Sequence, residues 1–142
     1  MQTFDNFSNA VIDINSPNDD VTINQKIDDH SRGTIICHDL TIGQKIDQHS
    51  ADADDDGAPA LEIRASGSVF IGQKIDQHCK VNITAGDTLH IGQKIDQHCK
   101  VTITAANLII DQGISQHCTV RYRVTGTANL GQIDGNCDVQ RF

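Results

Sequence analysis

The chain has 142 residues, only 4% of them aromatic, and a formal net charge of −8 at pH 7. This length predicts one domain over residues 1–142. The negative charge repels phosphate groups, so we expect no binding to nucleic acid or to anionic membrane surfaces. No apolar run is long enough to cross a bilayer, and the N-terminus has neither the basic start nor the apolar core of a signal peptide.

The N-terminal segment, residues 1–10, is predicted to cap one end of the fold. It precedes the first clear strand, Val11 to Asn15, and contains Phe4 and Phe7. An uncovered end of a stacked sheet exposes unpaired backbone and apolar side chains. We therefore expect the two phenylalanines to cover that end.

A repeated unit accounts for most of the chain after this segment. The sequence IGQKIDQHCKV occurs at Ile71 to Val81 and again, unchanged, at Ile91 to Val101. The aligned glutamines of successive copies are separated by 19, 29, 20, 19 and 20 residues; they are Gln25, Gln44, Gln73, Gln93, Gln112 and Gln132. A fixed period of this length is typical of a solenoid, in which each unit stacks on the next.

Within one unit, the alternation of residue types predicts strands. Val81, Ile83 and Ala85 alternate with polar residues, which is the period of a strand with one buried face. The sequence therefore predicts an all-β fold, a single-stranded parallel β-helix of about six coils of 19–20 residues. We expect right-handed coiling, because parallel crossovers are overwhelmingly right-handed. The left-handed hexapeptide solenoid is the alternative, although it needs a small residue where this unit has Ile95.

The chain resembles β-solenoid proteins as a class over nearly its whole length. In its length and architecture it is also similar to bactofilins, which are short cytoplasmic β-helices. That resemblance implies that the protein polymerises end to end.

The longest interval between copies contains an acidic insertion, residues 51–59. Asp52, Asp54 and Asp56 match the opening of a calcium-binding loop, in which alternate carboxylates converge on the ion. The pattern then requires Glu where this chain has Ile63, and Glu62 lies one place early. The segment is therefore interpreted either as a solvated acidic loop at a corner of the solenoid or as a weak Ca²⁺ site. No other cofactor is expected.

Repetition turns each polar position of the unit into a column. In the most regular coils the columns contain Lys74 and Lys94, Asp76 and Asp96, and His78 and His98. Alternation counted from the inward residues Ile95 and Cys99 predicts that all three columns lie on the outer surface. They are interpreted as a solvated face of balanced charge, or as a surface that binds a divalent metal or changes charge near about pH 6.

Four of the five cysteines occupy the same place in successive coils; they are Cys79, Cys99, Cys118 and Cys137. Ser31 and Ser50 hold that place in earlier coils. A place that accepts either residue is expected to be small and buried, so we predict a column of reduced thiols, with disulfides between neighbouring coils as the alternative. Reduced thiols indicate the cytoplasm, either of the cell that makes the protein or of a host cell.

The C-terminal segment, residues 130–142, is a truncated coil. It has Asn136 where earlier copies have His, and its last residue is Phe142. We recognise no capping pattern in it. We therefore expect a homo-oligomer contact through this coil, end to end about a two-fold axis.

Together these features favour a non-enzymatic structural or protein-interaction module that associates with copies of itself. Every acid and base is repeated from coil to coil, whereas an enzyme needs a unique cleft, usually built by long loops. The first alternative is a secreted bacterial effector or surface-binding protein that docks through the Lys/Asp/His columns or through Ca²⁺ on the acidic loop. The second is a small polysaccharide-active enzyme with its site beside the 51–59 loop.

Overall fold

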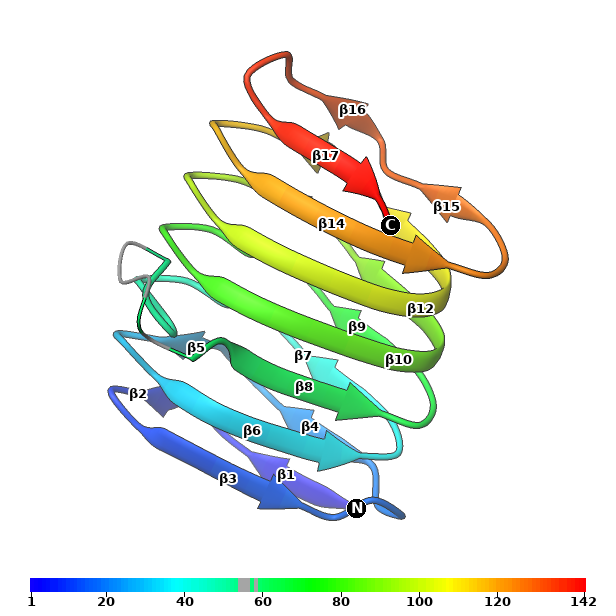
Figure 1. Ribbon diagram of the computed structural model, residues 1–142. Coiled ribbons are helices and arrows are strands. Elements are labelled where there is room, and N and C mark those ends of the chain that lie inside the picture. Colours follow the sequence, from blue (N-terminus) through cyan, green and yellow to red (C-terminus); the bar gives the residue numbers. More distant parts are fainter. Residues whose placement is uncertain (54–56, 58) are drawn as a thin grey trace.

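The described residues form a solenoid of parallel β-strands. The computed structural model describes residues 1–53, 57 and 59–142. In that part of the chain all strand pairs are parallel and there is no helix. The chain winds through about seven turns, which lie above one another in Figure 1. The predicted all-β solenoid is confirmed.

Each turn contributes strands to three faces, and the long face carries the longest ones. Its strands keep the register of the repeat, so that Val81 pairs with Val101 and Ile83 with Ile103. The long face consists of β3 (Val11–Asn15), β6 (Arg32–Cys37), β8 (Leu61–Ala65), the first parts of β10 (Lys80–Ile91) and β12 (Lys100–Ile110), β14 (Thr119–Val124) and β17 (Asp138–Arg141).

The return face follows the long face around a corner. Strands β10 and β12 continue across this corner, with a register shift between Ala85 and Thr88. The return face consists of β1 (Gln2–Phe4), β4 (Val21–Ile23), β7 (Leu40–Ile42), β9 (Val69–Ile71), the second parts of β10 and β12, and β15 (Ala128–Asn129).

The short face closes five of the turns with strands of two residues. These strands are β2 (Phe7–Ser8), β5 (Ile27–Asp28), β11 (Lys94–Ile95), β13 (Gly113–Ile114) and β16 (Gln132–Ile133). Single bridges at Ile46 and Ile75 continue the face between β5 and β11.

The core consists of aliphatic columns with one residue from each turn. Ile75 bridges to Ile95, and Ile95 pairs with Ile114 in the next turn. All three side chains are at most 1% exposed. Burial of one such side chain stabilises the fold by about 1.5–3 kcal/mol. The stacked interior expected from the repeat is therefore present.

The sense of coiling can be followed in Figure 1. The near strands, those of the long face, run from left to right while the chain climbs from β1 at the bottom to β17 at the top. A chain that crosses the near side to the right as it rises is wound in the right-handed sense. The expected right-handed coil is therefore observed.

Residues 1–10 take part in the first turn. Strand β1 pairs with β4, and β2 pairs with β5. The structure has about seven turns where about six were expected, because these strands begin a turn of their own. Among the described residues, no helix has the length and apolar character needed to cross a membrane.

Candidate functional site

The corner between the short face and the long face has an unusual backbone. Gln97 and His98 have φ angles of 59° and 62°, in the left-handed region that residues other than glycine rarely adopt. Four other turns repeat this geometry, at Asp29–His30, Gln48–His49, Gln77–His78 and Gln116–His117. A residue other than glycine in this conformation lowers the stability of the fold by about 1–2 kcal/mol. Backbone bonds between turns offset part of that cost, as where the His98 N–H donates to the Gln116 carbonyl at 2.9 Å.

The left-handed corners hold a column of stacked imidazoles. We call His30, His49, His78, His98 and His117 the histidine column. Neighbouring ring centroids are 4.9–5.4 Å apart and their planes differ by 8–13°. The predicted histidine column, including His78 and His98, is therefore present. It presents ring nitrogens of successive turns side by side along one edge of the solenoid.

The aspartate column, in contrast, is buried. The exposed fractions of Asp28, Asp47, Asp76 and Asp96 are 7%, 0%, 1% and 1%. The prediction that Asp76 and Asp96 lie on a solvated surface is wrong. Each aspartate follows its lysine by two residues, and Asp47, Asp76 and Asp96 lie just past the strand or bridge of the short face, where simple alternation no longer applies. Asp134, which has no described turn beyond it, is exposed.

Each buried aspartate forms an ion pair with the lysine of its own turn. The distances from Nζ to a carboxylate oxygen are 3.2–3.5 Å for Lys26–Asp28, Lys45–Asp47, Lys74–Asp76 and Lys94–Asp96. In all four aspartates the other carboxylate oxygen, Oδ1, has no hydrogen-bond partner within the part of the chain that the structure describes. Lys74 and Lys94 are about a quarter to a third exposed. The lysines thus lie at the surface as predicted and neutralise a buried row of carboxylates.

Burial perturbs the pKa of at least one of these carboxylates. Burial raises the pKa of Asp76, because a charged carboxylate loses its hydration there. Lys45 and Lys74 oppose this increase, and Asp96 and Asp47 add to it. The charge on Asp76 therefore depends on the neighbouring lysines.

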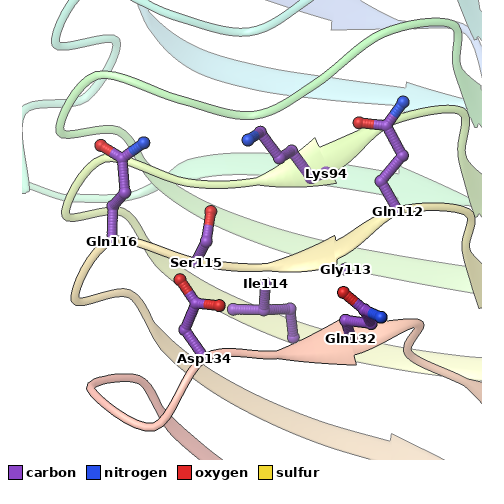
Figure 2. A pocket seen from close by; sticks show the side chains of 8 residues that line it. All are labelled: Lys94, Gln112, Gly113, Ile114, Ser115, Gln116, Gln132 and Asp134. Carbon is purple, nitrogen blue, oxygen red and sulfur yellow. The ribbon is translucent and has the colours of Figure 1, made fainter.

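The fifth copy of the unit has neither residue of the ion pair. Gly113 stands in the place of the lysine and Ser115 in the place of the aspartate. The space left forms a pocket of about 290 Å³, which Figure 2 shows between Lys94 and Asp134. The Ser115 hydroxyl is buried there without a hydrogen-bond partner among the described residues. Amides of Gln112, Gln116 and Gln132 complete the polar lining. This pocket was not predicted, although the two replacements are visible in the repeat.

The acidic insertion begins beside the histidine column. Oδ1 of Asp52 lies 3.1 Å from Nδ1 of His49. Asp54 and Asp56, the other residues of the predicted calcium loop, lie outside the described residues. Calcium binding by this loop therefore stays a prediction. The contact between Asp52 and His49 was not predicted, because the spacing within the insertion does not show how the segment leaves the corner.

A second histidine–aspartate cluster lies at the opposite end of the long face. Nδ1 of His38 is 2.8 Å from Oδ1 of Asp20 and 3.7 Å from Oδ2 of Asp39. The hydrogen bond to Asp20 raises the pKa of His38, and the same bond lowers the pKa of Asp20. All three residues are at least partly exposed, so this pairing makes little difference to stability. The separation of 18 residues between Asp20 and His38, close to one turn, is the sequence signal that could have identified it.

The thiols form the predicted column on the interior side of the corner. The backbone N–H of Cys79 donates to Sγ of Cys99, and that of Cys99 to Sγ of Cys118, both at 3.4 Å. Ser31 and Ser50 occupy the same place, and their hydroxyls donate to the carbonyls of Asp28 and Asp47. All five cysteines are free, and only Cys137 is not fully buried. Cys37 lies outside the column; burial, with Asp39 and Asp20 adding to it, raises its pKa to about 11.

We expect the thiols to differ sharply in reactivity. Cys137 should react with a thiol reagent in the native protein, because it is the only partly exposed cysteine. Cys37, Cys79, Cys99 and Cys118 should react only after unfolding, because their burial keeps the reagent out of contact with the sulfur atoms. A spectrophotometric thiol titration at pH 8 with and without denaturant measures this. Fast native reaction of more than one thiol would contradict the buried column.

The last turn leaves apolar side chains uncovered. Ile133 is 45% exposed and Phe142 is 49% exposed. Strands β15, β16 and β17 pair with β12, β13 and β14 on their inner side, and no described strand pairs with their outer edges. Leu130, Cys137 and Val139 are only partly buried. This end of the solenoid has the composition and the free backbone edge of a contact surface.

Comparison with known proteins adds no assignment to this geometry. No known protein family, curated protein or solved structure matches the chain.

Proposed function

We propose that this protein is a non-enzymatic structural module whose last turn binds the last turn of a second copy. The observation that carries the proposal is the uncovered apolar end. Ile133 and Phe142 are about half exposed there, next to strand edges that no described residue pairs. A parallel sheet with a free edge is a template for pairing with another chain.

The two ends of the solenoid differ in how well their apolar side chains are covered. This difference favours the last turn over the first as the contact surface. In the first turn, Phe4 and Phe7 pack against the core with their ring centroids 5.2 Å apart. Ile12 and Ile14, in β3 of the same turn, are 2% and 6% exposed. The first turn therefore covers its own core with large side chains. The last turn has no comparable pair, so it gains more from a partner.

The charges around the last turn suit a contact between identical surfaces. Arg121 forms an ion pair with Asp138 at 2.8 Å. The guanidinium of Arg123 lies over the ring of Phe142, 4.7 Å from its centroid. Because this end carries both signs of charge, two copies related by a two-fold axis can place cations opposite anions.

The arrangement of acids and bases supports a role without catalysis. Within a turn, the lysine and the aspartate form an ion pair at 3.2–3.5 Å. The same pair recurs in four turns along the solenoid. A repeated ion pair of this kind does not by itself build the unique cleft that a catalytic site needs. The proposed contact at the last turn, by contrast, uses residues outside these columns, Ile133 and Phe142.

Replacing the exposed apolar residues of the last turn should abolish association. We expect Ile133→Glu and Phe142→Glu each to shift the protein to a monomer, because a buried carboxylate without a partner is strongly unfavourable at an interface. Sedimentation velocity at several protein concentrations measures the change. Phe70→Glu is the matched control, since Phe70 is 40% exposed on the return face and far from the end.

The orientation of the contact needs a further variant. Val11, 68% exposed in β3, lies on the first turn. Val11→Glu should leave association intact if last turn meets last turn. Loss of association in Val11→Glu would indicate head-to-tail stacking, and loss in Phe70→Glu would indicate association through another surface; either result contradicts the proposed contact.

A further inference from the structure

Three metal-binding side chains come together where the acidic insertion leaves the corner. One ligand atom each from His30, His49 and Asp52 lies within 4.8 Å of the other two. The imidazoles come from successive turns and stack with centroids 5.4 Å apart. The carboxylate comes from the start of the insertion, 3.1 Å from Nδ1 of His49. No other turn of the repeat has an aspartate in this position, because only here does the chain insert residues after the corner.

The position of Asp52 is fixed by the backbone on both sides. The Ala51 N–H donates to the carbonyl of Ser31, and the Ala53 N–H donates to that of His78, both at 2.7 Å. Ala51 and Ala53 are 4% and 2% exposed, so the chain is anchored in the solenoid on either side of the carboxylate. A carboxylate held in this way loses little conformational freedom when it binds an ion.

The backbone at this place is strained. Ala51 has φ 46°, and both histidines also have positive φ angles. Residues other than glycine in this region cost on the order of 1–3 kcal/mol each and concentrate at functional sites. The strained backbone places the side chains of His30, His49 and Asp52 close together, which is the kind of placement for which such strain is retained.

The donor set selects a class of metal. Two imidazole nitrogens and one carboxylate oxygen suit borderline divalent transition metals, whereas Ca²⁺ and Mg²⁺ prefer sets of oxygens. Three protein ligands leave one or more positions for water, which matches the partial exposure of His49 and Asp52.

We propose that His30, His49 and Asp52 form a binding site for a divalent transition-metal ion such as Zn²⁺. The site joins two turns of the solenoid to the base of the insertion. It lies at the side of the solenoid, so it is independent of the contact at the last turn. The metal would stabilise the fold by binding to the native state and would fix the start of the insertion.

The other histidine–aspartate cluster is a weaker candidate. It supplies a single imidazole, that of His38. Its carboxylates already accept backbone hydrogen bonds, Asp20 from the Asp39 N–H at 3.2 Å and Asp39 from the Ser68 N–H at 2.7 Å. Those bonds give this cluster a structural role in joining adjacent turns.

Calorimetric titration of the tag-free protein with Zn²⁺, and separately with Ca²⁺, tests the site. We expect one Zn²⁺ per chain and a melting temperature that rises with Zn²⁺. Asp52→Asn and His49→Ala should weaken Zn²⁺ binding at least about tenfold. His98→Ala is the matched control, because His98 stacks between His78 and His117 at the same corner. Its Zn²⁺ affinity should equal that of the wild type, and circular dichroism without metal should be the same for all variants.

Four other results of these titrations would each overturn the proposal. Absence of Zn²⁺ binding to the wild type removes the site. An unchanged affinity in Asp52→Asn removes the carboxylate from it. An equal loss in His98→Ala and His49→Ala indicates binding along the whole histidine column. Tighter binding of Ca²⁺ than of Zn²⁺ favours the acidic loop alone as the ligand.

Discussion

Replacing Lys74 by methionine is expected to lower the free energy of unfolding by about 3 kcal/mol at pH 7. The variant leaves the carboxylate of Asp76, which is 1% exposed, without the ammonium that lies 3.4 Å away. Removing one partner of a buried ion pair lowers the free energy of unfolding by more than the intact pair adds to it, because the remaining charge stays desolvated. Lys45 compensates in part, since it also lowers the pKa of Asp76. Urea denaturation measures the difference.

The pH dependence gives this prediction a distinct signature. Burial raises the pKa of Asp76 above the unfolded value of 3.8, so the folded state takes up the proton first as the pH falls. Protonation of Asp76 therefore stabilises the fold, and the loss in Lys74→Met should shrink as the pH falls through the raised pKa. The double variant Lys74→Met/Asp76→Asn should regain most of the stability at pH 7.

An exposed lysine provides the control for the loss of charge. Lys100→Met, at an exposed place on the long face, should change the stability by less than about 0.5 kcal/mol, because even an ion pair contributes little at an exposed site. The account of the buried carboxylates is wrong if Lys74→Met is as stable as Lys100→Met, or if the double variant is no more stable than Lys74→Met alone.

The substitution Gly92→Ala is expected to destabilise the protein by about 3 kcal/mol, at the upper end of the usual cost of overpacking. A Cβ at Gly92 would lie 2.3 Å from the carbonyl oxygen of Gly72 in the turn below. That oxygen belongs to the backbone and cannot rotate away, so the two turns would have to separate. The same geometry recurs at Gly72, whose Cβ would lie 2.3 Å from the oxygen of Gly43. Thermal and urea denaturation measure the loss.

Gly135 is the matched control for this substitution. Apart from its chain neighbours, no described residue has a heavy atom within 4 Å of a Cβ at Gly135, in the last turn. Gly135→Ala should therefore change the stability by less than about 0.5 kcal/mol. Equal stabilities of Gly92→Ala and Gly135→Ala would show that the turns are not in the close contact described above.

The repeat predicts the fold because it determines the register. Identical residues at a fixed period place Ile75 over Ile95 and Val81 over Val101 in any stacked arrangement, and the structure has these pairs. The number of turns was underestimated, since residues 1–10 share little sequence with the unit and yet pair with β4 and β5. Backbone pairing needs only an extended chain there, so it leaves little trace in residue identity.

The candidate sites could be predicted only in part. The columns of lysine, aspartate and histidine follow from the repeat, but the burial of Asp76 and Asp96 does not. Burial depends on which side chains of neighbouring turns cover a position, and strand alternation alone does not give that. The left-handed corner at Gln97 and His98 was also not predicted, because these residues lack the glycine or asparagine that usually marks positive φ.

The most direct test of the proposed function is the mass of the tag-free wild-type protein measured by sedimentation equilibrium from nanomolar to high micromolar concentration. A contact between the last turns of two copies predicts a reversible change from the monomer to twice the monomer mass, with no larger species. A monomer at every concentration would contradict self-association. A mass that keeps increasing with concentration would contradict the two-fold contact, because each copy would then use both of its ends.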